Sequence, residues 1–192
     1  MTGIISSSSA WTPQGGRSQN ERLILWLIRR QGPMPRAALA QATGLSAQAI
    51  SNITRDLIAE GLLDAGGARK RGKVGQPLRP LALAPDGALF LGLKVGRRLV
   101  ELVLVVFLGQ IRQFRSQTYA FPAPDEIRDF ARDAIAGMLA ELPPALRARL
   151  SGMGIAMPFY LWDWGREMAL WRGRDLRLEL AEALDIPVWL EN

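Results

Sequence analysis

The sequence predicts an α+β fold in two parts. The first is a helix-rich N-terminal part with a short two-stranded sheet, and the second is a mixed α/β part. Two observations predict the first part. Two short helical patterns meet at Thr43-Gly44-Leu45-Ser46, and a basic, glycine-rich segment separates two short apolar segments. A third observation predicts the second part, because the apolar patterns after residue 85 follow the order β-β-β-α-β-α-β.

Composition limits the chemistry that the chain can perform. The 192 residues are enough for one large or two small domains, and 48% of them are hydrophobic. The chain contains no Cys and no His, which excludes disulfides and His-based acid–base catalysis and argues against a zinc site. No metal and no cofactor are therefore expected.

Positive charge is concentrated in the N-terminal part. Residues 1–84 carry 11 Lys and Arg against 4 Asp and Glu, whereas residues 85–192 carry 13 against 14. Such segregation is typical of proteins that bind a polyanion, although a merely basic surface is the alternative. No signal peptide is evident, and the apolar stretch 99–108 is too short to span a bilayer. We therefore expect a cytoplasmic protein with no membrane partner.

Three helices are expected after an aperiodic tail, residues 1–17. Ser18 and Glu21 form a capping-box pattern, so the first helix begins there and runs to about residue 30. Its predicted buried stripe is Leu23, Ile24, Leu27 and Ile28. A second helix covers about residues 36–42, and a third begins after Ser46 as its cap and ends before Gly61.

The third helix has two chemically different faces. The spacing i, i+3, i+4, i+7 places four polar side chains without acids on one face: Gln48, Ser51, Asn52 and Arg55. The opposite face is aliphatic: Ile50, Ile53 and Leu57. A helix that enters a DNA major groove needs this division, with Ser46 at its start. The alternative is an ordinary solvated helix face.

A basic loop follows the helices and predicts a wing. Residues 66–80 contain no acid and lie between the apolar segments 62–63 and 81–83. Their cations are Arg69, Lys70, Arg71, Lys73 and Arg79. These side chains would neutralise phosphates or enter a groove, unless the loop is simply solvated. The first part, residues 18–84, is therefore predicted to be a winged helix-turn-helix DNA-binding domain.

The second part, residues 85–192, begins with a predicted three-stranded meander. The expected strands cover residues 88–93, 99–108 and 111–119, followed by a helix over 125–142. A buried strand (152–157), a helix (175–184) and a last strand (187–190) complete the order. By analogy, this order is that of one ribonuclease-H-like lobe of the actin and hexokinase superfamily.

Several motifs resemble the ROK family of repressors, open reading frames and sugar kinases, on its repressor branch. The segment TGLSAQAISNITRDLIAEGLL resembles the family's helix-turn-helix pattern, and Gly75-Gln76-Pro77 resembles its wing segment with Gln76 in place of the usual Arg. GMGIAMPFY (152–160) resembles a strand beside the family's sugar site. The resemblance covers residues 18–192 and implies a sugar-binding second part.

The same resemblance implies that the chain is not an enzyme. Residues 89–98 lie where the family's kinases have a phosphate-binding loop. In this chain, Lys94 occupies the acidic position of that loop, and Arg97 or Arg98 occupies its Thr position. A Lys cannot assist Mg²⁺ binding as a carboxylate does. Binding of an anion by these cations is a weaker interpretation than a solvated turn.

The expected effector site lies toward the end of the chain. The resemblance places Glu191 and Asn192 at the family's sugar site and implies a chain truncated after the first lobe, before the family's catalytic Asp and second lobe. A loop adds the aromatic residues Trp162, Trp164 and Trp171 with the acids Asp163 and Glu167. These residue types suit a sugar, but they equally suit a hydrophobic surface exposed by truncation or a dimer contact.

Together these patterns predict a DNA-binding transcriptional regulator. We expect a homodimeric repressor of carbohydrate genes that binds double-stranded DNA and responds to a sugar or sugar phosphate. The alternatives are a sugar kinase or sugar-binding protein with an appended helix-turn-helix, or a non-functional truncated fragment.

Overall fold

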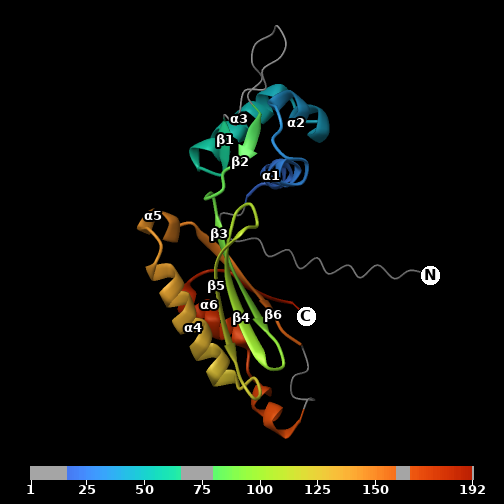
Figure 1. Ribbon diagram of the computed structural model, residues 1–192. Helices are drawn as coiled ribbons and strands as arrows, with labels where there is room; N and C mark the ends of the chain where they lie inside the picture. Colours follow the sequence, from blue (N-terminus) through green and yellow to red (C-terminus); the bar gives the residue numbers. More distant parts are fainter. Residues whose placement is uncertain (1–16, 66–79, 159–164, 192) are drawn as a thin grey trace, which may run out of the picture.

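The computed structural model describes residues 17–65, 80–158 and 165–191 (Figure 1). A small helical part lies at one end of the molecule, and strand β3 leads from it into a larger sheet. The helical part contains α1 (Gln19–Gln31), α2 (Arg36–Thr43), α3 (Ala47–Ala59), β1 (Leu63–Ala65) and β2 (Leu81–Leu83). β1 and β2 pair antiparallel, with Asp64 opposite Ala82.

The ends of the first helices follow from local chemistry. Ser18 Oγ accepts a hydrogen bond from the Glu21 backbone N–H (3.2 Å), and Glu21 Oε2 accepts one from the Ser18 N–H (2.7 Å). This reciprocal capping box satisfies two N–H groups that have no partner within the helix. Helix α2 ends at Gly44, whose φ of +72° is strained for a residue with a side chain. The chain then turns into α3.

A hydrophobic cluster joins all five elements of the helical part. Its fully buried side chains include Ile24, Leu39, Ile50, Leu57, Leu63 and Leu81. The predicted stripe of α1 is therefore largely confirmed, but the inclusion of Leu23 was wrong because 37% of this residue is exposed. Leu23 lies at the edge of the stripe, where helical periodicity alone does not decide burial.

The larger part is one five-stranded sheet with helices. Its elements are β3 (Leu89–Val95), β4 (Leu99–Val106), β5 (Ile111–Thr118), α4 (Pro124–Ala140), α5 (Pro144–Arg147), β6 (Leu150–Ala156), η2 (Arg166–Trp171), α6 (Leu176–Leu184) and β7 (Val188–Glu191). The strand order is β5-β4-β3-β6-β7, with β3–β4 and β4–β5 antiparallel and β3–β6 and β6–β7 parallel. The predicted β-β-β-α-β-α-β order is confirmed, with α5 and η2 as additional short helices.

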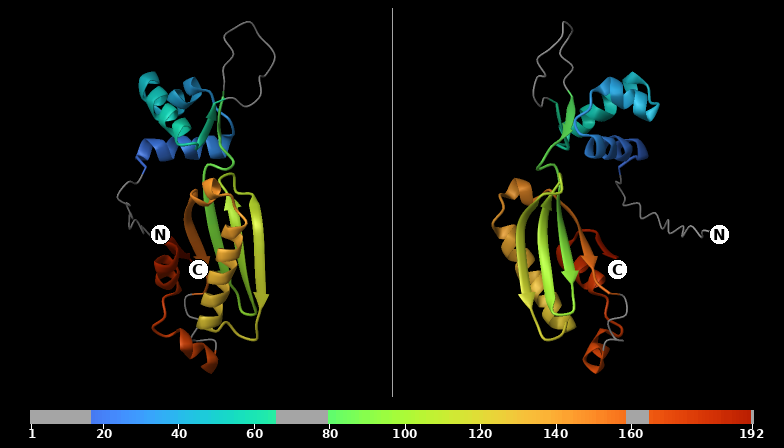
Figure 2. Two further views of the ribbon diagram at one scale, coloured as in Figure 1. Left: turned by 90° about the vertical axis from the view of Figure 1, so that its left-hand side faces the viewer. Right: turned by 45° about the vertical axis from the view of Figure 1, so that its right-hand side comes forward.

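Helices α4 and α6 cover one face of the sheet (Figure 2). Alternate residues of β3, such as Leu91 and Leu93, are buried under these helices with Ile127 of α4 and Leu180 of α6. No described helix covers the other face, so Gly154 of β6 is exposed. The predicted buried strand is confirmed in its position, with Met153 and Ile155 buried on the covered face, whereas Gly154 and Ala156 are exposed on the other face. None of the described helices is long and apolar enough to cross a membrane.

Candidate functional site

Helix α3 presents the predicted polar face to solvent. Gln48, Ser51 and Arg55 are exposed and Asn52 is half-buried. On the opposite side, Ile50 and Leu57 are fully buried, and Ile53, the third predicted member of that face, is partly buried. The helix is thus fixed by its apolar face, and its polar side chains stand on a rigid support.

The start of α3 is also fixed. Ser46 is the N-cap, and its Oγ accepts a hydrogen bond from the Ala49 N–H at 3.2 Å. Because the hydroxyl uses only an acceptor position in this bond, its own hydrogen remains able to donate. The N-terminal end of a helix also carries partial positive charge, which favours an approaching phosphate.

Two amides on the polar face are ordered by one hydrogen bond. Gln48 Nε2 donates to Asn52 Oδ1 at 3.1 Å. The side-chain oxygen Oε1 of Gln48 can still accept a hydrogen bond from a binding partner, and the side-chain NH₂ group of Asn52 can still donate one. One acceptor and one donor side by side match the edge that adenine presents in the major groove.

The polar face borders an acid. Arg55 Nε lies 3.5 Å from Asp56 Oδ1, and both side chains are largely exposed, at 70% and 60%. The prediction of a face without acids therefore needs this correction, since Asp56 follows Asn52 by one helical turn. An exposed pair contributes little energy, so Arg55 can leave it for a phosphate.

A buried polar contact holds α2 against α3. Arg36 Nε of α2 donates to Thr54 Oγ1 of α3 at 3.0 Å, and Thr54 is fully buried. Thr54 Oγ1 also lies 3.4 Å from the Ser51 carbonyl oxygen, to which it donates. Sequence reasoning missed this pair, although a Thr between Ile50 and Leu57 on an aliphatic face signals a buried hydrogen bond.

Several predicted site residues lie outside the described residues. Of the proposed wing these are Arg69, Lys70, Arg71, Lys73 and Gln76, and of the proposed effector site they are Trp162, Asp163, Trp164 and Asn192. Glu191 is described. It is the exposed last residue of β7 and lies opposite Ala156 in the register.

The carboxyl ends of three parallel strands meet at one edge of the sheet. The register places Lys94 of β3 beside Ala156 of β6, and Ala156 beside Glu191 of β7. In open α/β sheets, ligands bind at this end of the strands. Lys94 is itself paired, because its Nζ lies 3.0 Å from Glu101 Oε2 on β4. We call this end of the sheet the effector end, after the effector site that the sequence predicts here.

The turn after β3 is held by a tyrosine. Tyr119 donates its hydroxyl hydrogen to the Gly96 carbonyl oxygen at 2.7 Å, and burial raises the pKa of Tyr119 to about 12. The hydroxyl therefore stays protonated as a donor at neutral pH. Arg97 and Arg98 of the same turn are exposed, as the solvated-turn interpretation expects.

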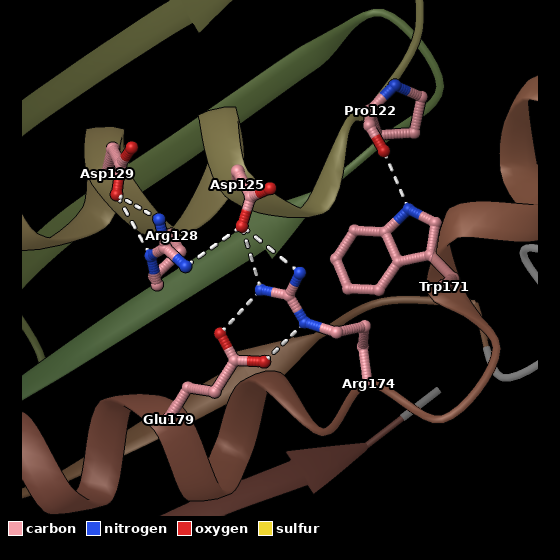
Figure 3. A network of polar contacts seen from close by, with 7 residues as sticks. All are labelled: Pro122, Asp125, Arg128, Asp129, Trp171, Arg174 and Glu179. Atoms are coloured by element: carbon pink, nitrogen blue, oxygen red, sulfur yellow. Dashed lines mark hydrogen bonds and ion pairs between the residues drawn. The ribbon is translucent and has the colours of Figure 1, made fainter.

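Trp171 is not a sugar platform. Its side chain is only 4% exposed, and its Nε1–H donates to the Pro122 carbonyl oxygen at 2.6 Å (Figure 3). The interpretation of Trp171 as a sugar-stacking residue was therefore wrong, because the ring belongs to the hydrophobic core of the lobe.

An arginine network beside Trp171 joins α4 to α6 (Figure 3). Arg174 donates two hydrogen bonds to Glu179, at 2.7 and 2.8 Å, and two to Asp125 Oδ1, both at 3.1 Å. The bonds to Glu179, more than those to Asp125, raise the pKa of Arg174 above its ordinary value. Every side chain in this network has a partner within it, so we assign it a structural role.

Among the described residues, no group of three or more acids is placed to hold a metal ion.

Comparisons with known proteins cover both parts of the chain. Residues 17–64 match the family described as winged helix-turn-helix DNA-binding. The xylose repressors of Bacillus spizizenii and Bacillus subtilis are 26% and 25% identical over 180 residues, which are 90% of this chain and 46% of each repressor. A transcriptional regulator of Mycobacterium bovis is 28% identical over 152 residues, which are 76% of this chain and 28% of that protein.

A solved structure has the same fold. The crystal structure of a ROK family transcriptional regulator, a homologue of the E. coli Mlc protein, matches with a TM-score of 0.65 and 21% identity over 90% of this chain and 45% of that chain. The chain thus spans about half the length of the xylose repressors and of this ROK regulator. The predicted two-part fold, a winged helix-turn-helix followed by a mixed α/β lobe, is confirmed, and the chain is similar to repressors and to a ROK family regulator, as the sequence resemblance implied.

Proposed function

We propose that this protein, which has the two-part fold of the ROK regulators, binds operator DNA through helix α3 and represses carbohydrate genes in response to a sugar or sugar phosphate. The single observation that carries the proposal is the exposed polar face of α3. Because the opposite, aliphatic face of α3 is buried, this polar face is held toward solvent. The xylose repressors and the mycobacterial protein among the matching relatives are regulators, which favours regulation over catalysis.

On α3 we assign base contacts to the amides and phosphate contacts to the remaining polar groups. Gln48 and Asn52 present one acceptor and one donor after their mutual hydrogen bond, which suits an adenine edge. Ser46, Ser51 and Arg55 then position the helix by binding phosphates. The wing residues 69–73 and Gln76 add phosphate or groove contacts on the strength of the sequence.

We place the effector at the effector end of the lobe. Two of the relatives are xylose repressors, which supports a sugar ligand. Glu191, the last residue of β7, has an exposed carboxylate at this end of the sheet. On the strength of the sequence, we propose that Trp162, Asp163, Trp164 and Asn192 complete the site. We further propose that the chain forms a homodimer, because an operator with two-fold symmetry needs two recognition helices. We also propose that the chain divides into two domains, residues 18–84 and 85–192.

The test is selection of bound sequences from a randomised duplex pool at two salt concentrations. We expect enrichment of a palindrome, with affinity that falls steeply as salt rises. The variant Gln48→Ala should lose enrichment at specific positions, whereas Gln117→Ala on exposed strand β5 is the matched control. Salt-dependent binding without enrichment would contradict sequence-specific regulation, and absence of binding at low salt would overturn the DNA-binding proposal altogether.

A further inference from the structure

Two arginines cross the junction between the helical part and the lobe in opposite directions. Arg149 of the lobe donates to the Glu60 carbonyl oxygen at the end of α3 and more weakly, at 3.5 Å, to that of Gly87. Arg29 of α1 donates to the Phe107 carbonyl oxygen of the lobe at 2.6 Å. The recognition helix is therefore connected to the lobe by its own C-terminal end.

Each arginine fits against a glycine. A Cβ at Gly61 would lie 2.8 Å from Arg149 Nη2, and one at Gly109 would lie 3.1 Å from Arg29 Nη2. Both glycines have positive φ, +73° and +85°, a conformation that side chains disfavour. The backbone thus leaves space for both guanidinium groups.

The contact at α3 is electrostatically favourable. Glu60 is the C-cap of the helix, where carbonyl oxygens without helical partners concentrate negative charge. A guanidinium there satisfies one of these oxygens. Phe90 and Phe107 of the lobe add apolar contact by packing against the hydrophobic cluster of the helical part.

Arg149 also stands at the base of the strands that form the effector end. It directly precedes β6, and its carbonyl oxygen accepts a hydrogen bond from the N–H of Leu89, the first residue of β3, at 2.9 Å. Seven residues of extended strand span about 20 Å. A single strand, β6, therefore runs from Arg149 to the effector end.

We infer that Arg149 is a positioning residue that fixes the recognition helix on the lobe, at the base of the strand β6 that leads to the effector end. Arg29 secures the same junction from the other side. The inference rests on the proposed function for its consequence in DNA binding, but the mechanical connection is testable without DNA.

The first test measures whether the two parts move as one body. In ¹⁵N relaxation of the full chain, we expect one common rotational correlation time. Arg149→Ala should give the helical part and the lobe different correlation times. The matched control is Arg147→Ala, because Arg147 lies two residues away and donates within the lobe, to Leu142. A common correlation time in Arg149→Ala would overturn the inference.

The second test measures affinity for the duplex that the wild-type chain selects. Couplings between sites typically change affinity about 5- to 150-fold, and we expect Arg149→Ala to weaken specific binding within that range. Binding to random duplex should stay unchanged, as should both affinities in Arg147→Ala. Equal losses on both duplexes would contradict a positioning role. If the wild-type chain selects no duplex, the proposed function fails, while the relaxation measurement still decides the junction.

Discussion

The helical part and the lobe place their functional groups in different ways. In the helical part, the α3 groups that we assign to DNA lie close together in sequence, from the N-cap Ser46 to Arg55, and the buried face of the helix orients them together. In the lobe, the effector end brings together the ends of strands that are far apart in sequence. Lys94 lies near the end of β3, and Glu191 is the last residue of β7. Local periodicity therefore predicts the first site, whereas the second requires the sheet topology.

The largest expected effect concerns Trp171, whose two interpretations differ most. As a core residue with a buried hydrogen bond to Pro122, its replacement by Ala should lower the free energy of unfolding by about 3–5 kcal/mol. Trp26→Ala is the matched control, because Trp26 is 50% exposed and its ring lies beneath the Arg30 guanidinium in a cation–π arrangement. It should cost about 1 kcal/mol or less. Chemical denaturation followed by circular dichroism measures both, and equal losses would restore the surface interpretation of Trp171.

The next effect separates the two amides of α3 from the rest of the surface. Gln48→Ala and Asn52→Ala should each remove about 1–3 kcal/mol of discrimination between correct and incorrect bases. Competition binding with duplexes changed at single positions measures this, with Gln117→Ala as the exposed control. A uniform loss over all duplexes would instead assign the amides to phosphates.

Particular residues explain how much of the structure could be predicted from sequence. Ser18, Gly44 and Ser46 act within a few residues of themselves, so the limits of α1 and the turn before α3 were predicted correctly. Trp171 and Arg174 act on partners 49 residues away, Pro122 and Asp125, which no local pattern encodes. The short helices α5 and η2 were missed for a related reason, because four or six residues carry little periodicity.

A smaller effect tests whether the contact between α2 and α3 orders the recognition helix. Thr54→Val keeps the buried shape and removes the acceptor of the Arg36 Nε–H, so the free energy of unfolding should fall by about 1 kcal/mol. Thr118→Val, at an exposed end of β5, is the control and should change it by less than about 0.5 kcal/mol. Thermal denaturation compares the two variants. Equal stability would show that water replaces the hydroxyl at no cost.

The smallest effect tests the role of Arg55 as a phosphate contact. Its pair with Asp56 is exposed, so Arg55→Ala should leave the stability of the fold unchanged and weaken DNA binding modestly on every sequence. The slope of log affinity against log salt concentration should fall by about 0.9, the value for one lost phosphate contact. Arg132→Ala removes the same charge from an exposed position on α4, and its slope should equal that of the wild type if the helical part alone contacts DNA. A matching decrease in Arg132→Ala would mean that net charge, rather than contact by α3, sets the salt dependence, and the functional difference between the two parts would no longer hold.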